Sequence, residues 1–207
     1  MKLLDTVEYR CQANINIYDS PKCDRLATQA AAGRHLQIVC DSSPLAMESK
    51  DNQQAAIAVR LCEDDYPGWL AVCDTHLLEV AQTPYQAQFF SSAEIRDKLQ
   101  SAIAFTHHAM NQPNHYLWGG TLPPNYDCSG LMQAAFASVD IWLPRDAYQQ
   151  EAFTQPLALE SVQPGDLIFF GTVDKATHVG LYLGQGRYIH SSGKEQGRNG
   201  IGIDILS

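Results

Sequence analysis

The chain has 207 residues, 45% of them hydrophobic, and a formal net charge of −9. This hydrophobic content is typical of a folded protein of one large or two small domains and excludes an intrinsically disordered chain. The acidic balance disfavours nucleic acid and anionic membranes as partners, because both carry negative charge themselves.

The N-terminal segment predicts neither secretion nor membrane insertion. Asp5 and Glu8 interrupt its apolar residues, so the apolar centre of a signal peptide is missing. No apolar run in the sequence reaches membrane-spanning length. We therefore expect a cytoplasmic protein whose cysteines stay reduced and serve mainly as small buried apolar side chains. Five of the six cysteines lie within the first 73 residues without C-x-x-C spacing, which predicts no metal site and no cofactor: Cys11, Cys23, Cys40, Cys62 and Cys73.

The first 80 residues are predicted to form a small β-barrel. Short apolar or alternating runs are separated by turn residues, and residues 26–32 are ambiguous between helix and strand. The segment Asp64-Asp65-Tyr66-Pro67-Gly68 reads as a turn, in which the two acidic side chains are either solvated or attract an amine. Residues 81–92 read as a linker. The predicted strands lie at 13–18, 35–40, 56–62 and 69–73.

Residues 93–207 are predicted to form an α+β domain. A capping box at Ser91 and Glu94 begins a helix that ends near Asn111. A second helix begins at Cys128, and a short third helix is expected over 146–153. The strand-like runs that follow are short and separated by turns, which predicts an antiparallel meander with the helices packed on one face: 166–170, 178–183, 187–190 and 201–205.

Cys128 is the strongest candidate for a catalytic residue. It stands at a loop-to-helix junction, between Asp127 and Ser129. The unpaired N–H groups and the positive dipole end of a helix N-terminus favour thiolate, so we expect the pKa of Cys128 to be lowered. A buried structural cysteine is the alternative for a lone residue of this type, but two histidines on later strand-like runs argue for catalysis.

His178 and His190 are the candidate partners of this thiol. A hairpin brings them to adjacent strands, where His178 would act as the base and His190 would orient its ring. Each also has a structural alternative, His178 as a core histidine and His190 as part of a turn. The backbone N–H of Cys128 is the first candidate for an oxyanion donor.

Four motifs in this order resemble the NlpC/P60 family of cell-wall peptidases. They cover about residues 93–205, and the β-rich front part is similar to a bacterial SH3 domain. The motifs are Tyr116-x-Trp118-Gly119-Gly120, Asp127-Cys128-Ser129-Gly130-Leu131, Pro164-Gly165-Asp166-Leu167-Ile168-Phe169-Phe170, and His178-Val179-Gly180-Leu181-Tyr182 followed by His190-Ser191.

The resemblance implies a papain-like catalytic domain, a catalytic triad of Cys128, His178 and His190, and peptidoglycan stem peptides as substrate. Members with a front SH3 domain resemble γ-D-glutamyl-L-diamino acid endopeptidases that select a free N-terminal L-Ala. By this likeness the substrate-binding residues are Tyr66 as a gate, Asp127 toward the substrate amine, Ser129 beside it, and Tyr116 as a hydroxyl donor. Ala147 stands where the family often has serine.

We expect an intracellular cysteine endopeptidase that acts in wall-peptide recycling. Three other functions stay open: hydrolysis of the intact wall, a catalytically silent wall-peptide binding module, and a related papain-like amidase or acyltransferase.

Overall fold

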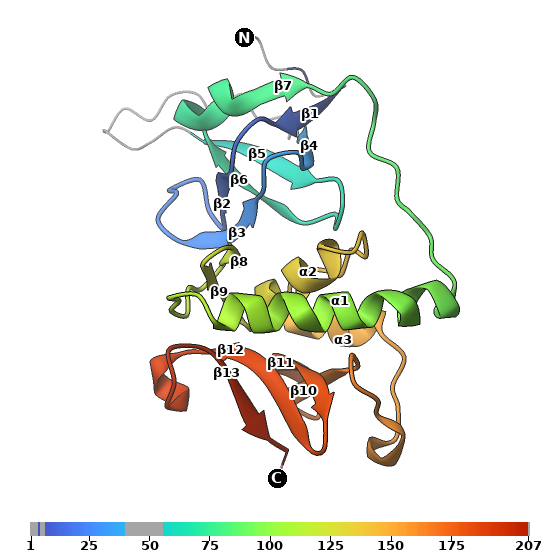
Figure 1. The fold of residues 1–207 in the computed structure, drawn as a ribbon. Coiled ribbons are helices and arrows are strands. Elements are labelled where there is room, and N and C mark those ends of the chain that lie inside the picture. The colour runs from blue at the N-terminus through green and yellow to red at the C-terminus, as the bar shows by residue number, and fades with distance from the viewer. Residues whose placement is uncertain (1–3, 5–6, 40–55, 207) are drawn as a thin grey trace. The chain divides into compact units, whose positions relative to one another are not determined.

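The structure is a computed structural model that describes residues 4, 7–39 and 56–206. The chain forms two compact units, residues 1–87 and 88–207, which are coloured blue to green and green to red in Figure 1. The division lies within the 81–92 stretch that the sequence marks as a linker. Cys40, with the end of the strand predicted over 35–40, lies outside the described residues.

The first unit is a seven-stranded antiparallel sheet in the order β3-β2-β6-β5-β4-β1-β7. A 3₁₀ helix, η2 (Val72–Leu77), connects the last two strands along the chain. The strands are β1 (Glu8–Cys11), β2 (Ile15–Tyr18), β3 (Leu26–Ala30), β4 (His35–Ile38), β5 (Ala56–Leu61), β6 (Pro67–Ala71) and β7 (Leu78–Val80).

The alternating residues of this unit face its core as their pattern predicts. Ile15 and Ile17 of β2 are 2% and 0% exposed, while Asn16 between them is exposed. The ambiguous 26–32 stretch contains strand β3 (Leu26–Ala30), whereas the strand predicted over 69–73 ends at Ala71 and continues as η2. β3 and β7 are the outer strands, and no ladder joins them in the described residues, so barrel closure stays a prediction.

The acidic turn of this unit is partly buried. Asp64 Oδ1 accepts a hydrogen bond from Arg34 Nη2 at 2.8 Å, and the Asp64 side chain is 0% exposed. Glu63 Oε2 accepts from Arg34 Nε at 3.1 Å. Only Asp65, whose side chain is 80% exposed, fits the solvated turn that the sequence suggests. Asp64 is therefore a structural partner of Arg34, because a buried guanidinium requires a counter-charge.

The described cysteines are not uniformly buried. Cys11 and Cys128 are buried, Cys23 and Cys62 are half-buried, and Cys73 is exposed. The prediction of burial is therefore correct for Cys11 and wrong for Cys73, which lies in η2 rather than in a strand.

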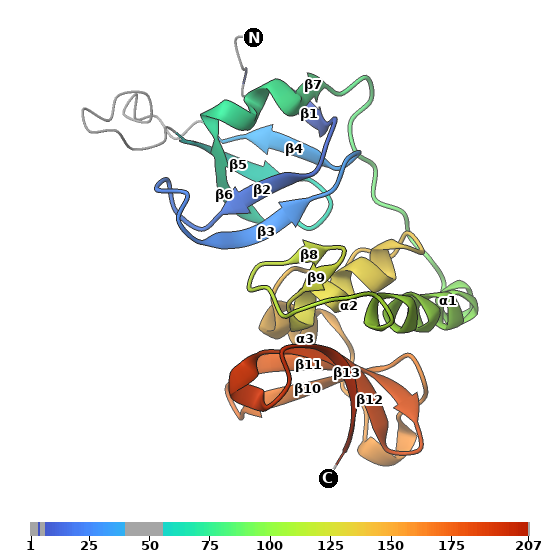
Figure 2. The ribbon, with the colours of Figure 1, turned by 60° about the vertical axis from the view of Figure 1, so that its left-hand side comes forward.

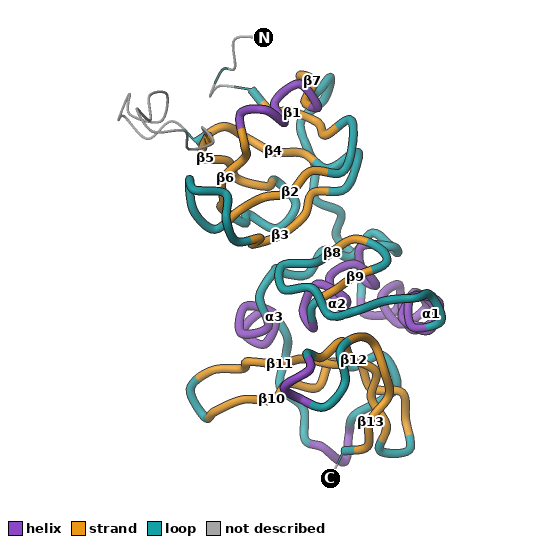
Figure 3. The backbone as a smooth tube through the Cα atoms, turned by 90° about the vertical axis from the view of Figure 1, so that its left-hand side faces the viewer, coloured by secondary structure: helices purple, strands orange, loops and turns teal. Residues whose placement is uncertain are grey.

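The second unit is α+β, as predicted, with helices over an antiparallel meander in the order β10-β11-β12-β13. Figures 2 and 3 show the three helices in one layer on one face of this sheet. The elements are α1 (Ser92–Met110), β8 (Thr121–Leu122), β9 (Asn125–Tyr126), α2 (Cys128–Ala137), α3 (Ala147–Phe153), η3 (Leu159–Ser161), β10 (Leu167–Thr172), β11 (Lys175–Gly184), β12 (Arg187–Ser192), η4 (Lys194–Gln196) and β13 (Gly200–Ile205).

Local signals set the ends of these helices. The capping box of α1 is present: Glu94 N donates to Ser91 Oγ at 3.3 Å, and Ser91 N donates to Glu94 Oε2 at 2.7 Å.

The core lies between α2 and the sheet, where Leu131, Leu181 and Ile189 are fully buried. None of the helices in the described part of the chain combines the length and hydropathy needed to cross a membrane.

Candidate active site

Cys128 is the first residue of α2 and is 8% exposed. The N-cap residue is Asp127, whose Oδ1 accepts a hydrogen bond from Gly130 N at 2.7 Å. The predicted loop-to-helix junction is therefore confirmed. The N–H groups of Ser129 and Val179 both favour the thiolate form of Cys128 through hydrogen bonds, so the sulfur lies between the first turn of α2 and strand β11.

The loop before α2 approaches the helix closely. Gly119 N donates to Asp127 Oδ2 at 2.8 Å, and Asp127 N donates to Gly120 O at 3.1 Å. A Cβ at Gly130 would overlap the Gly120 carbonyl oxygen and would lie 2.9 Å from Asp127 Oδ1. Only a glycine fits at position 130 without moving this loop, which explains the Cys-Ser-Gly sequence in physical terms.

Arg145 holds the same segment from the other side. Its guanidinium is 1% exposed and donates to Asp127 Oδ2 at 2.6 Å, to Asp127 Oδ1 at 3.1 Å and to Ser129 Oγ at 3.0 Å. Asp127 therefore caps α2 and balances a buried cation. This role of Arg145 was not identified from the sequence. Substrate contacts by Asp127 and Ser129 stay predictions, since these groups already serve this network.

His178 and His190 lie on the adjacent strands β11 and β12. His178 Nε2 and His190 Nδ1 are 2.6 Å apart, and the two rings are nearly perpendicular at 86°. Because His178 Nε2 makes this hydrogen bond, Nδ1 is the ring nitrogen that the contact with His190 does not use. Gly180, two residues after His178, makes room for the pair: a Cβ there would lie 3.2 Å from His190 Cβ and 2.6 Å from Tyr188 Cδ2.

Asp204 of β13 continues this hydrogen-bonded chain, and the sequence analysis missed it. Its Oδ2 lies 2.9 Å from His190 Nε2, and its Oδ1 accepts from Arg198 Nη2. Burial alone would raise the pKa of Asp204, but the hydrogen bond from His190 and the charge of Arg198 hold it below its ordinary value. The available signal was one acidic residue in the Gly-rich apolar strand Gly200–Ile205, which pairs with the His190 strand.

Aromatic side chains cover the two imidazoles. The Phe170 ring lies 5.9 Å from His178 and 4.9 Å from Tyr188, and Tyr188 lies 4.8 Å from His190. This cover removes water from the rings and disfavours their charged forms.

The titration of the pair differs from the sequence-based expectation. Burial raises the pKa of Cys128 to about 11, and the charge of Asp127 adds to this, against the N–H groups of Val179 and Ser129 and the charge of Arg145. Burial, followed by repulsion from His190, lowers the pKa of His178 to about 4. The prediction of a lowered cysteine pKa is therefore wrong, because burial outweighs the helix N-terminus. At neutral pH the pair consists of a thiol and a neutral imidazole.

Tyr116, predicted to bind substrate, interacts electrostatically with Cys128. It forms an isolated parallel bridge with Tyr126, next to the start of α2. Burial, together with the charges of Cys128 and Asp127, raises the pKa of the Tyr116 phenol. The phenol therefore stays protonated and keeps its capacity to donate a hydrogen bond.

Tyr66 belongs to the first unit. It is half-buried, its carbonyl accepts from Leu61 N at 2.9 Å, and its own N–H points to Asp64 Oδ1 at 3.4 Å. The part of Tyr66 as a gate for substrate stays a prediction.

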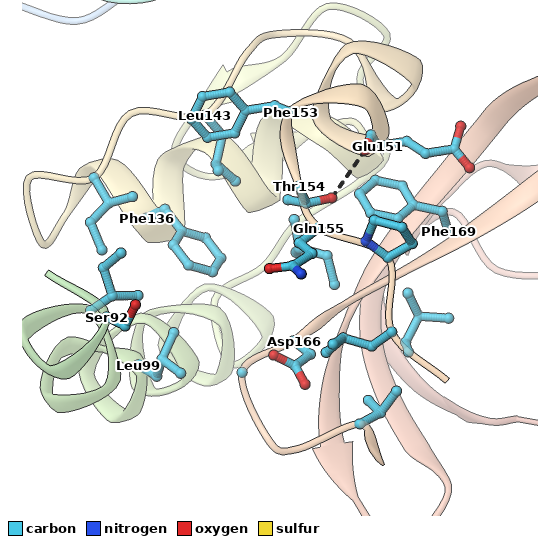
Figure 4. A pocket seen from close by; sticks show the side chains of 18 of the residues that line it. Ser92, Leu99, Phe136, Leu143, Glu151, Phe153, Thr154, Gln155, Asp166 and Phe169 are labelled. Carbon is cyan, nitrogen blue, oxygen red and sulfur yellow. Dashed lines mark hydrogen bonds between the residues drawn. The ribbon is translucent and has the colours of Figure 1, made fainter. Parts of the chain in front are cut away.

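A separate cavity of about 730 Å³ lies in the second unit between α1, α3 and β10. Figure 4 shows Phe136, Leu143, Phe153 and Phe169 around it. The residues lining it include neither the cysteine nor the two histidines. This cavity is therefore not the place where the thiol meets a substrate.

Comparisons with known proteins found a family model that matches part of each unit. The model of the NlpC/P60 family matches residues 113–202, and that of the bacterial dipeptidyl-peptidase SH3 domain matches residues 17–74. Among curated relatives, the bifunctional muramidase/DL-endopeptidase CwlT of Bacillus subtilis is 43% identical over 37% of this chain and 25% of its own length. The gamma-DL-glutamyl hydrolase of the same species is 40% identical over 39% of this chain and 21% of its own length.

A solved structure extends this likeness. The peptidoglycan hydrolase RipB of Mycobacterium tuberculosis is 27% identical, with a TM-score of 0.50, over 61% of this chain and 67% of its own. The chain spans only a quarter or less of the two curated relatives.

Proposed function

Because the chain carries an NlpC/P60 domain and a bacterial SH3 domain, we propose that it is a cysteine peptidase of peptidoglycan stem peptides. The bond cleaved is the one between γ-D-glutamate and the L-diamino acid, in peptides with a free N-terminal L-Ala. One observation carries this proposal: Cys128 begins α2 beside β11, where His178 Nε2 lies 2.6 Å from His190 Nδ1. The similarity to a DL-endopeptidase and a gamma-DL-glutamyl hydrolase supports the choice of bond.

The proposed reaction begins with a neutral pair. His178 Nδ1 takes the thiol proton as Cys128 Sγ attacks the carbonyl carbon, since the resting sulfur is not ionised. The imidazolium then gives this proton to the leaving amine, and an acyl-enzyme remains. In the second half, His178 takes a proton from the water that attacks the thioester. The C–S bond then breaks, the L-Ala-γ-D-Glu part leaves, and His178 returns the proton to the Cys128 sulfur.

Oxyanion stabilisation comes from the start of α2. The N–H of Cys128 is the first donor, because the first N–H groups of a helix have no partner within it. The Tyr116 hydroxyl is the second donor. In subtilisin, the loss of one such donor lowered kcat by about 100- to 1,000-fold. A Tyr116→Phe variant therefore tests this role directly.

The finer fold assignments belong to the same proposal. The helices over an antiparallel sheet suit a papain-like domain, with the nucleophile at the start of the helix and the base on the sheet. The seven-stranded front unit suits an SH3-type barrel. Tyr66 of the front unit would select short peptides as substrates, and Asp127 would bind their free amine.

We place the activity in the recycling of wall peptides in the cytoplasm. The five described cysteines outside any disulfide are compatible with a reducing compartment. Hydrolysis of intact wall is the competing function within the same chemistry.

The test compares free stem tripeptide, the same peptide N-acetylated on L-Ala, and intact sacculi as substrates. The proposal predicts release of L-Ala-γ-D-Glu from the free peptide alone, and no release by Cys128→Ala. Release from sacculi but not from free peptide would reject recycling. Equal activity of the Cys128→Ala variant would reject the peptidase itself. A Tyr66→Ala variant that gains activity toward the acetylated peptide would support the gate role.

A further inference from the structure

We infer that Asp204, held by Arg198, fixes the direction of the hydrogen bonds through His190 and His178 and so keeps Nδ1 of His178, the base of the proposed function, unprotonated. This inference rests on the proposed function, in which His178 is the base. Asp204 does not touch the reacting atoms in this scheme. It is a positioning residue that acts through two imidazoles.

The direction follows from the donors and acceptors in the chain of contacts. A carboxylate can only accept hydrogen bonds, so His190 Nε2 carries the proton in its 2.9 Å contact with Asp204 Oδ2. In a neutral imidazole the other nitrogen is then an acceptor, so His190 Nδ1 accepts the 2.6 Å hydrogen bond from His178 Nε2–H. His178 Nδ1 is left with a lone pair, as a base requires.

The orientation would be undetermined without this carboxylate. Between two neutral imidazoles, either ring can donate the hydrogen bond. If His190 Nδ1–H donates to His178 Nε2, the hydrogen of His178 lies on Nδ1. A base with a hydrogen at that position cannot accept the thiol proton. Burial lowers the pKa of both histidines, so each ring exists as one of the two neutral tautomers near pH 7. The Asp204 carboxylate, which can only accept a hydrogen bond, selects one of these two tautomers.

The contact between Arg198 and Asp204 makes the inference testable. Arg198 Nη2 donates a hydrogen bond to Asp204 Oδ1. The Arg198 guanidinium passes over Gly202, the residue that pairs with His190, and a Cβ at Gly202 would overlap it. A guanidinium can only donate. In an Asp204→Asn variant the amide oxygen would therefore turn to Arg198 and the NH₂ group to His190. The hydrogen bonds would then run in the reverse direction.

The experiment compares four proteins: wild type, Asp204→Asn, Arg198→Met and the double variant. We expect Asp204→Asn to lower kcat/KM about 100-fold, at the upper end of the effect of groups that orient a functional histidine. Arg198→Met alone keeps the carboxylate and should stay within about fivefold of wild type, as for a partly exposed ion pair. In the double variant the amide is free to turn its oxygen to His190, so most of the lost activity should return.

Imidazole ¹⁵N NMR provides a readout independent of catalysis. In wild type we expect the proton on Nε2 of both His178 and His190, and in Asp204→Asn on Nδ1 of both. Unchanged tautomers in Asp204→Asn, or a double variant as impaired as Asp204→Asn, would overturn the inference. If the wild type cleaves none of the peptides, the proposed function fails, but the tautomers still decide whether Asp204 sets the direction. Thermal unfolding controls for a loss of fold.

Discussion

Removal of the Arg145 guanidinium should destabilise the second unit strongly. Arg145 is 1% exposed, and its hydrogen bonds include those of 3.1, 3.0 and 2.6 Å to Asp127 and Ser129. An Arg145→Met variant keeps most of the apolar volume but leaves the Asp127 carboxylate, 9% exposed, without its counter-charge. Breaking a buried pair in this way costs about 3–5 kcal/mol. We expect the lower end, because the N–H groups of Gly119 and Gly130 still bind the carboxylate.

The assay must report on the second unit alone, since two units need not unfold together. In a Trp69→Phe background, tryptophan fluorescence comes only from Trp118 and Trp142. Urea unfolding in this background gives the free energy of unfolding of that unit. A variant with Asp127→Asn added to Arg145→Met should recover part of the loss, because the unpaired charge is gone.

A matched control comes from a more exposed pair in the same unit. Lys98 Nζ and Asp140 Oδ2 are 3.9 Å apart, with side chains 28% and 67% exposed. Lys98→Met should cost no more than about 1 kcal/mol. A loss of under about 1 kcal/mol for Arg145→Met as well would refute the reasoning, since it would mean that Asp127 does not need its buried cation.

Three further predictions concern the Cys128 thiol, the packing of Gly180 and the cap of α1. Alkylation of Cys128 by iodoacetamide should accelerate about tenfold per pH unit from 7 to 10, because the thiolate is the nucleophile and the pKa is about 11; a rate independent of pH near neutrality would indicate a preformed ion pair instead. Gly180→Ala should shift the His190 ring and lower kcat/KM. The control is Gly186→Ala, whose Cβ would meet no neighbour and which tests only the strain of a positive φ. Equal activities of the two variants would argue against the packing of Gly180 on His190. Ser91→Ala should cost about 1 kcal/mol in urea unfolding, as the loss of a helix cap does, and an unchanged midpoint would argue against the cap.

The effect of pH on stability provides an independent check on the histidine. The pKa of His178 is lowered to about 4 in the folded state, so the unfolded chain binds the proton more tightly. The resulting stabilisation is fully present above the ordinary histidine pKa of about 6.5 and is lost as the pH falls toward 4. A His178→Gln variant should lose this part of the acid dependence of urea unfolding. Identical pH profiles for the two proteins would contradict the burial of a neutral ring.

Local signals in the sequence predicted most of the elements. The capping box at Ser91 and the position of Cys128 after Asp127 depend on neighbouring residues, so both could be predicted without a structure. The pairing of His178 with His190 follows from one hairpin. Such short-range features need only propensity and turn chemistry.

Long-range contacts could not be predicted in this way. Asp204 reaches His190 only because β13 pairs with β12, and Arg145 reaches Asp127 only after the chain returns beside α2. The wrong prediction for the pKa of Cys128 has the same origin. The sequence predicts the helix N-terminus that lowers this pKa, whereas the burial that raises it depends on the core that Cys128 shares with Val179 and Leu181 of β11.

Trapping of the acyl-enzyme tests the central claim most directly. Wild-type protein is mixed with free stem tripeptide, quenched in acid during the first turnovers and analysed by mass spectrometry. We expect the L-Ala-γ-D-Glu acyl group as a thioester on the peptide that contains Cys128, and no adduct in a His178→Ala variant. Release of product at the wild-type rate by a Cys128→Ala variant, with no adduct in either protein, would contradict the account.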